Sequence, residues 1–278
     1  MSKVAVVQMV SSASIKENLA RVERVLSKAH KEQVDLVCLP ENFAFMGLRE
    51  TDKLTVAESY GSGEIQDAIS RMAKKFRIWI VAGTIPLKSS GNRLRAASLV
   101  FDDHGLCAAR YDKIHLFDVR VSDEEAHQES RTVERGDEIV VVDTPVGRLG
   151  LTVCYDLRFP ELYQQLVMRG AELFSIPSAF TAVTGAAHWD VLLRARAIEN
   201  LCYVLAPNQG GQHENGRHTF GHSMIVEPWG KILTQQKKGV GMKTATIDLA
   251  RLRQLRRQFP CHDHHVLQVF NHLQQVTS

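Results

Sequence analysis

The segment VGRLGLTVCYDLRFPELY, residues 146–163, contains the strand end and the helix start on which the predicted fold depends. Its apolar run at 148–153 is typical of a buried strand. Pro160 suits the first turn of a helix, so a helix is expected from about that residue. Cys154 stands between the two elements. A single cysteine at a strand end is most often a buried thiol, so this stretch alone leaves open whether Cys154 reacts.

Outward from this segment, short β-branched runs alternate with helical periods along the whole chain. Strands are predicted at 3–10, 34–39, 77–82, 96–102, 106–112, 138–142, 148–153, 172–176 and 202–206, with another ending at 247–248. Helices are predicted at 16–33, 63–76, 189–200 and 249–258. Hairpin turns separate 96–102 from 106–112 and 138–142 from 148–153. The pattern predicts an α/β fold of mixed sheets covered by helices, in one domain over 1–278 with a C-terminal tail from about 260.

The composition is that of an ordinary globular protein and excludes several classes of function. The 278 residues carry a formal net charge of +3, with 23% charged and 44% hydrophobic residues. Such a charge does not indicate a nucleic-acid partner, and the basic run at 251–257 is interpreted as the solvated face of a helix. No apolar window is long enough to span a membrane, and the N-terminus lacks the pattern of a signal peptide. Five dispersed cysteines without a C-x-x-C pair are typical of a reducing compartment, so a cytoplasmic location is expected.

The motifs of several common enzymes are missing. The sequence contains no G-x-S-x-G elbow, no phosphate-binding G-x-x-x-x-G-K-S/T loop and no H-E-x-x-H. Gly61-Ser-Gly63 lacks the third glycine of a dinucleotide loop. The His-rich stretch 261–265 is interpreted as surface or packing residues rather than as metal ligands. We therefore expect neither a metal ion nor a cofactor.

Three residues with useful chemistry follow predicted strands. Glu41, Lys113 and Cys154 each come at or just after a strand end, where open sheets tend to place their sites. Singly, each is explained by a cap, a solvated side chain or a buried thiol. Together, a carboxylate, an ammonium group and a thiol suffice for acyl transfer. Their coincidence at three strand ends therefore favours a catalytic site.

The proposed chemistry requires a thiolate, because a free cysteine has a pKa of about 8.5 and is mostly protonated at neutral pH. We expect Lys113 and the start of the following helix to lower the pKa of Cys154. Glu41 is expected to remove the thiol proton and later to protonate the leaving amine. The ammonium group of Lys113 and the backbone N–H of Tyr155 are expected to stabilise the oxyanion of the intermediate.

Several motifs also resemble those of a known family. They are Pro40-Glu41-Asn42, Tyr111-Asp-Lys-Ile-His-Leu-Phe117, Val153-Cys-Tyr-Asp-Leu-Arg-Phe-Pro-Glu161, Ser178-Ala-Phe180 and Gly221-His-Ser-Met224. With them the chain resembles the nitrilase superfamily of carbon–nitrogen hydrolases, in its Nit branch. The resemblance implies a four-layer α-β-β-α sandwich, a homodimer or higher homo-oligomer, and a triad of Glu41, Lys113 and Cys154.

The resemblance further implies a second glutamate in the long polar excursion at 117–137. Gln128-Glu129-Ser130 matches that family segment, so Glu129 is the assignment, with Glu124 and Glu125 as nearby rivals. Glu129 is expected to orient Lys113 and the attacking water. Arg158 is a candidate clamp for a substrate carboxylate. A structural ion pair of Arg158 with Asp156 or Glu161 is an equal alternative.

The implied reaction is hydrolysis of a small anionic amide through a thioester. Within the Nit branch the Gly-His-Ser-Met motif and the segment at 252–257 are closest to amidases of deaminated glutathione, which release 2-oxoglutarate and cysteinylglycine. Amidases of α-ketoglutaramate (ω-amidases) and N-carbamoyl amino acid hydrolases are the enzymatic alternatives. A catalytically silent binding scaffold is the alternative from another class, and the four intact residues Glu41, Lys113, Glu129 and Cys154 argue against it.

Overall fold

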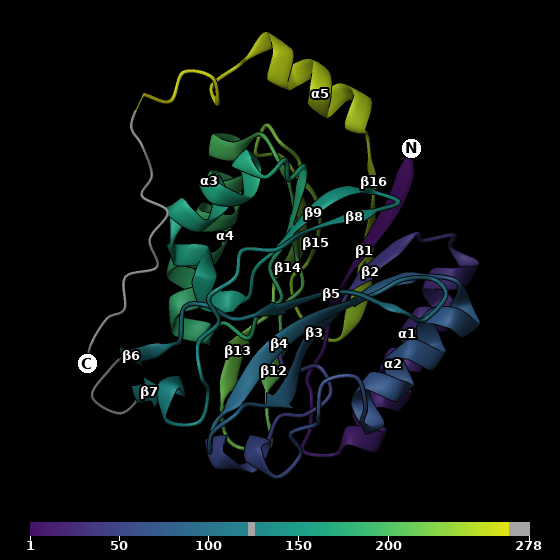
Figure 1. Ribbon diagram of the computed structural model, residues 1–278, viewed down its shortest axis with the longest axis vertical. Helices are drawn as coiled ribbons and strands as arrows, with labels where there is room; N and C mark the ends of the chain where they lie inside the picture. Colours follow the sequence, from purple (N-terminus) through teal and green to yellow (C-terminus); the bar gives the residue numbers. More distant parts are fainter. Residues whose placement is uncertain (122–125, 267–278) are drawn as a thin grey trace.

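Two six-stranded sheets face each other and are covered on their outer sides by helices (Figure 1). The computed structural model describes residues 1–121 and 126–266. Helices α1 (Ile15–Lys31) and α2 (Glu64–Phe76) cover one sheet, and α3 (Pro160–Met168) and α4 (Ala182–Asn200) cover the other. The four-layer α-β-β-α architecture implied by the family resemblance is thus confirmed. Helix α5 (Leu249–Gln258) lies at one end of the molecule.

The first sheet has the strand order β16-β1-β2-β3-β4-β5. Its strands are β1 (Ser2–Gln8), β2 (Leu36–Cys38), β3 (Trp79–Lys88), β4 (Leu94–Phe101), β5 (Cys107–Asp112) and β16 (Gly241–Ile247). The pairs β1–β2 and β2–β3 are parallel, because a helix connects each pair, and the remaining pairs are antiparallel. The carboxyl end of β2 leads to Glu41, and β5 leads to Lys113.

The second sheet has the order β15-β14-β11-β10-β9-β8. Its strands are β8 (Val141–Thr144), β9 (Gly147–Leu151), β10 (Leu173–Ser175), β11 (Tyr203–Ala206), β14 (Ser223–Val226) and β15 (Ile232–Gln236). Parallel pairing joins β9, β10 and β11. Cys154 follows β9, so the three candidate residues come from both sheets. The catalytic geometry therefore depends on how the sheets dock.

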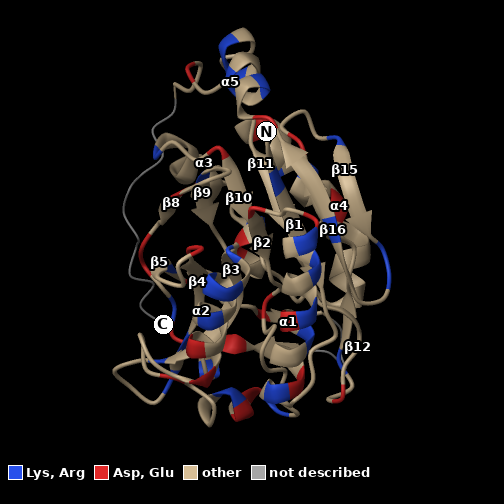
Figure 2. Cartoon of the chain, turned by 90° about the vertical axis from the view of Figure 1, so that its right-hand side faces the viewer, with Lys and Arg blue, Asp and Glu red and all other residues tan. Residues whose placement is uncertain are grey.

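The docking is fixed by one apolar core between the sheets and by a second under α1 and α2. Side chains of Val4, Val6 and Leu36 from the first sheet join those of Leu149 and Leu173 from the second. The other faces of β1 and β2 pack against the amphipathic helix α1, whose buried stripe includes Leu19, Val22 and Leu26. Basic and acidic side chains are interspersed along α1 and α2 rather than gathered into one basic surface (Figure 2).

Most predicted elements are confirmed, and both hairpins form as predicted. Three differences matter. Helix α4 begins at Ala182 rather than at 189, because the Thr181 side chain caps it by accepting the Thr184 N–H. The excursion at 117–137 contains the small hairpin β6 (Asp118–Arg120) and β7 (Ala126–Gln128) and the 3₁₀ turn η2 (Glu129–Arg131). Cys154 does not lead directly into an α-helix, since the 3₁₀ turn η3 (Cys154–Arg158) comes first.

Smaller elements complete the described chain. They are the 3₁₀ turn η1 (Glu50–Leu54) and the two-stranded ribbon of β12 (Gly210–Gln212) and β13 (His218–Phe220). Over residues 1–121 and 126–266, none of the helices has the length and apolarity needed to cross a membrane.

Candidate active site

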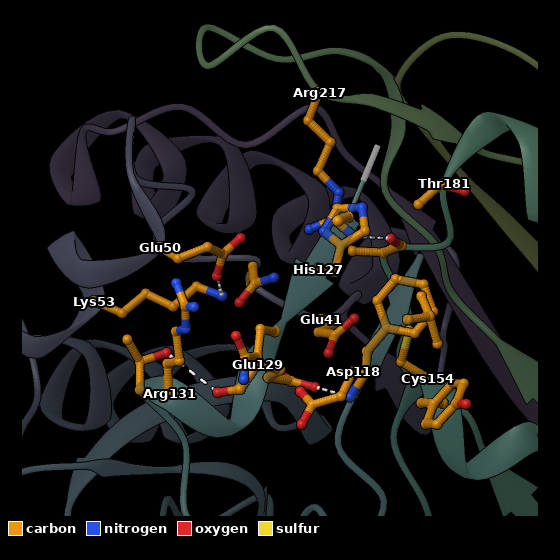
Figure 3. A pocket seen from close by; sticks show the side chains of 18 of the residues that line it. Glu41, Glu50, Lys53, Asp118, His127, Glu129, Arg131, Cys154, Thr181 and Arg217 are labelled. Atoms are coloured by element: carbon orange, nitrogen blue, oxygen red, sulfur yellow. Dashed lines mark hydrogen bonds and ion pairs between the residues drawn. The ribbon is translucent and has the colours of Figure 1, made fainter. Parts of the chain in front are cut away.

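A cavity of about 680 Å³ opens where the loops after β2, β5 and β9 meet. Glu41, Lys113, Glu129 and Cys154 all line it, although they are distant in sequence. Figure 3 shows the side chains of Glu41, Glu129 and Cys154 directed toward one another within this cavity. The structure thus brings together the four residues singled out in the sequence as the catalytic set.

Glu41 is held by the loop that leaves β2. The backbone of the next residue, Asn42, has a left-handed φ of 57° and donates its N–H to Thr84 Oγ1 at 2.9 Å. The carbonyl oxygen of Glu41 accepts Gln209 Nε2 at 2.9 Å. The Glu41 carboxylate is therefore aimed by backbone contacts on both sides, and it is only 5% exposed.

Lys113 reaches two carboxylates at once. Its Nζ lies 2.9 Å from Glu41 Oε1 and 3.0 and 2.8 Å from the two oxygens of Glu129. Burial alone lowers the pKa of Lys113, but the two negative charges outweigh it and hold this pKa well above its ordinary value. Lys113 is accordingly a permanent ammonium group, 1% exposed, suited to stabilising negative charge.

Glu129 opens the 3₁₀ turn η2 within the excursion. Besides Lys113, its Oε2 accepts the backbone N–H of Phe117 at 2.8 Å, which ties the two ends of the hairpin β6–β7 to the cavity. Its rivals from the sequence, Glu124 and Glu125, lie outside the described residues. The geometry of Glu129 agrees with the orienting role expected for it.

Cys154 occupies a sharp turn. Its φ of 51° lies in the left-handed region, which is uncommon for a residue with a side chain, and its N–H donates to the Pro177 carbonyl at 2.9 Å. The thiol lies next to the Glu41 carboxylate and the backbone of Ala179, both of which influence its pKa. The 3₁₀ turn η3 separates Cys154 from α3, so the sulfur does not lie at the N-terminus of an α-helix.

The expectation that the pKa of Cys154 is lowered is wrong. Burial raises this pKa, and the charge of Glu41 adds to the rise, while Lys113 opposes it. The Glu41 carboxyl behaves in the opposite way. Burial by itself raises the pKa of Glu41, but the ammonium group of Lys113 outweighs it, so this pKa lies below the ordinary value. The resting pair is thus a neutral thiol beside a carboxylate.

Asp156, which was not singled out as catalytic, joins the two catalytic loops. This fully buried carboxylate accepts Tyr111 Oη at 2.7 Å, the Val153 N–H at 2.8 Å and both the N–H and Nδ1 of His115, at 3.0 and 2.7 Å. Tyr111 and His115 flank Lys113 in sequence, and Val153 precedes the cysteine. Asp156 therefore fixes the Lys113 segment against the Cys154 turn.

Tyr155 lines the cavity as expected, whereas Arg158 does not. The Tyr155 N–H belongs to the first turn of η3, whose leading N–H groups have no partner inside the turn. The Arg158 guanidinium lies 3.3 Å from His188 Nδ1 and over the rings of Phe180 and Tyr155. It pairs with neither Asp156 nor Glu161 among the described residues, so the structure supports neither interpretation of Arg158.

The cavity wall contains charged residues that the sequence did not reveal. They are Arg49, Glu50, Lys53, Asp118, Arg120, Arg131 and Arg217. Figure 3 places Lys53 and Arg131 on one side of Glu129 and Arg217 on another. These residues come from short polar segments without a motif, including η1, β6 and η2, and only the length of the excursion at 117–137 gave a signal for some of them. Within the described part of the chain, no group of three or more His, Cys, Asp and Glu residues is arranged to hold a metal ion.

This chain is similar to known proteins over nearly its whole length. The model of the carbon–nitrogen hydrolase family matches residues 3–257. The deaminated glutathione amidase of Yersinia enterocolitica is 42% identical over 266 residues, 95% of this chain and 92% of that protein. The deaminated glutathione amidase of Synechocystis sp. is 44% identical, over 94% of this chain and 97% of that protein.

Among solved structures, the C. elegans NitFhit protein superposes with a TM-score of 0.88 at 39% identity. The match covers 95% of this chain and 65% of the NitFhit chain. The family model and the relatives thus extend over nearly the whole chain, including every residue of the cluster around Cys154. The chain belongs to the carbon–nitrogen hydrolase family, and it is a hydrolase of carbon–nitrogen bonds other than peptide bonds.

Proposed function

We propose that this protein hydrolyses deaminated glutathione to 2-oxoglutarate and cysteinylglycine, through a thioester on Cys154. The observation that carries the proposal is the buried cluster in which Lys113 Nζ lies 2.9 Å from Glu41, with the Cys154 thiol beside that carboxylate in the same cavity. The amidases of Yersinia and Synechocystis, which carry this activity in their names, support the choice of substrate.

In the acylation step, Glu41 takes the thiol proton while the sulfur of Cys154 attacks the amide carbonyl carbon. The carbonyl π electrons move to oxygen, and the resulting oxyanion is stabilised by Lys113 Nζ and the Tyr155 N–H. Glu41 then delivers the proton to the nitrogen, the C–N bond breaks, and the amine of cysteinylglycine leaves. The raised pKa of Cys154 makes this coupling necessary, because the free thiolate is scarce before substrate binds.

In the deacylation step, a water molecule takes the place of the amine. Glu41 removes one of its protons as the oxygen attacks the thioester carbonyl, and the same oxyanion donors act again. Collapse of the intermediate breaks the C–S bond, and the proton returns from Glu41 to sulfur. Glu129 holds Lys113 in place through both steps by its two contacts of 3.0 and 2.8 Å.

The charge of the cavity suits an anionic amide. Among the described lining residues there are six Lys or Arg side chains and four Asp or Glu side chains. Deaminated glutathione carries two carboxylates, so it matches this excess of positive charge. The volume of about 680 Å³ is also in the usual range for small-molecule sites.

A parallel steady-state assay tests the proposal. Deaminated glutathione, α-ketoglutaramate and an N-carbamoyl amino acid are offered to the same enzyme, and kcat/KM is compared. We expect the highest value for deaminated glutathione, with release of cysteinylglycine and no ammonia, and loss of turnover in Cys154→Ala. A large preference for α-ketoglutaramate would replace the proposal by ω-amidase activity, and full turnover by the alanine variant would contradict the role of Cys154.

We further propose that the enzyme is a cytoplasmic homodimer that needs neither metal nor cofactor. All five cysteines are free thiols, which suits a reducing compartment. On α4, Val191 and Ile198 are exposed, and so is Trp229 in the turn whose Gly230 lies next to Ile198, which gives apolar surface for a second copy. Light scattering on the purified protein tests the dimer, and full activity after dialysis against a chelator tests independence from metals.

A further inference from the structure

Arg217 is carried by a short loop between β12 and β13 that is fastened to its surroundings. Within the loop, the Arg217 N–H donates to Asn215 Oδ1 at 3.0 Å, and the Asn215 side chain donates to the Gly47 carbonyl at 2.9 Å. The Arg217 side chain extends into the active-site cavity next to His127 (Figure 3). Its Nη2 donates to the Ala179 carbonyl at 2.7 Å. This contact holds Arg217 against the loop of Ala179, which also lines the cavity.

The other buried or half-buried cations of the cavity already have carboxylate partners. Lys113 is paired with Glu41 and Glu129, and Lys53 is paired with Glu50 at 3.4 Å. Arg217 has no ion pair with any residue in 1–121 or 126–266. Arg49, Arg120 and Arg131 are exposed, whereas Arg217 is half-buried. Arg217 is therefore the partly buried cation of this wall that lacks a direct carboxylate partner in the described protein, although the Glu50 carboxylate interacts with its charge at longer range.

The hydrogen-bonding capacity of Arg217 is also incomplete. Its Nε is buried and finds no acceptor in the described chain. A buried donor without a partner costs about 1–3 kcal/mol, so such groups usually have a reason. A carboxylate bound to the guanidinium would supply the missing acceptor for Nε together with a direct ion pair.

The place of Arg217 indicates which end of a substrate it meets. It also lines a smaller surface cavity of about 390 Å³, together with Glu50 and His127. Arg217 thus stands at the outer part of the active-site cavity. A carboxylate there belongs to the longer arm of a bound amide. In deaminated glutathione the glycine carboxylate lies six bonds from the reacting carbonyl carbon, whereas the 2-oxo acid carboxylate lies four bonds away.

We propose that Arg217 binds the carboxylate of the leaving dipeptide and thereby selects deaminated glutathione over α-ketoglutaramate. The inference rests on the proposed function and deepens it. Arg217 is a specificity residue, because α-ketoglutaramate lacks this carboxylate and gains nothing from the guanidinium.

The test compares Arg217→Gln with the wild type on three amides: deaminated glutathione, its C-terminal glycinamide analogue and α-ketoglutaramate. We expect kcat/KM for deaminated glutathione to fall about 10- to 100-fold, mainly through KM, as for loss of a charged hydrogen bond. For the other two substrates kcat/KM should change less than about threefold, since each lacks the glycine carboxylate. Arg217→Lys, which keeps the charge but not the planar fork, should recover part of the loss.

Arg158→Gln is the matched control, because it removes an arginine that does not line the cavity. It should leave the ratio among the three substrates unchanged. An equal loss on all three amides in Arg217→Gln would mean that Arg217 supports Ala179 or binds the 2-oxo acid carboxylate that all three share, and it would overturn the inference, as would no loss at all. Failure of the wild type to cleave deaminated glutathione would instead contradict the proposed function.

Discussion

Two buried carboxylates lie on either side of the Cys154 turn, and their surroundings differ. The Glu41 carboxylate is surrounded by groups that exchange or respond to protons, namely the Lys113 ammonium group and the Cys154 thiol. The Asp156 carboxylate is surrounded by donors fixed in the backbone and by the side chains of Tyr111 and His115. Both are buried, but only Glu41 faces the cavity.

The difference separates a reactive carboxylate from a structural one. Glu41 can take up a proton and return it because the Cys154 thiol and the cavity lie beside its oxygens, while the charge of Lys113 keeps its resting form ionised. Asp156 accepts four hydrogen bonds that join the Lys113 segment to the Cys154 turn, and it does not line the cavity where a substrate would bind. Burial alone therefore does not identify a catalytic acid, and the kind of partner does.

The strongest way to break the reactive cluster is Glu41→Gln. We expect kcat on deaminated glutathione to fall by about 10²–10⁴-fold, because the amide can neither accept the thiol proton nor protonate the amine. The fold should persist, since Lys113 keeps its two contacts with Glu129. Steady-state kinetics with circular dichroism of the same sample measures both. A variant that keeps a tenth of the wild-type kcat would remove Glu41 from the mechanism.

Glu129→Gln weakens the same cluster from its other end. We expect kcat/KM to fall about 10- to 100-fold, as for loss of a partner that orients a catalytic group. Because Glu129 and Glu41 raise the pKa of Lys113 against the effect of burial, removing one charge lowers this pKa. The alkaline limb of the pH profile of kcat/KM should therefore move to lower pH. An unchanged limb with reduced activity would indicate that Glu129 acts only on the shape of the loop.

Asp156→Asn tests the structural carboxylate. One oxygen becomes an NH₂ group that must face donors, so the free energy of unfolding should fall by about 1–3 kcal/mol. We expect only about a tenfold loss of kcat, from displacement of Lys113 relative to Cys154. Urea unfolding and kinetics give the two numbers. If Asp156→Asn lost as much activity as Glu41→Gln while remaining fully stable, the distinction between the two carboxylates would fail.

The smallest effect is expected for Arg158→Ala. Its guanidinium contacts His188 and two aromatic rings rather than the cavity. Surface cation–π contacts contribute about 0.5–1 kcal/mol, so stability should change by that amount and kcat/KM by less than about threefold. Thermal unfolding and the standard assay measure the change. A large rise in KM would restore the sequence-based hypothesis that Arg158 binds the substrate carboxylate.

Much of the fold could be predicted because hydrophobic periodicity and turn-forming residues are local features of the sequence. The hairpin at β8–β9 and the helix at Pro160 follow from residues within a few positions. The start of α4 was missed because its cap, Thr181, precedes an apolar period that begins later. The sheet orders join strands far apart in sequence, as in the pairing of β1 with β16, and no local signal carries them.

The site residues likewise divide into those with a local sequence signal and those without one. Glu41, Lys113 and Cys154 were found because each marks a strand end, and Glu129 was assigned by the family segment. Arg217 was missed because its loop contains no motif and its position depends on contacts with Ala179 and Gly47 through Asn215. The pKa of Cys154 was predicted in the wrong direction, because the sequence shows the neighbouring charges but not the burial that outweighs them.

The origin of the catalytic residues on two different sheets has a consequence for how the enzyme fails. Glu41 and Lys113 follow strands of the first sheet, and Cys154 follows a strand of the second. The distances from Cys154 to Glu41 and Lys113 therefore depend on how the two sheets pack against each other. Each sheet can keep its own hydrogen bonds while a small slip between them separates thiol from carboxylate. The amidase activity therefore depends closely on how the two sheets pack together. With increasing urea concentration, activity should be lost before the circular dichroism signal of the strands changes.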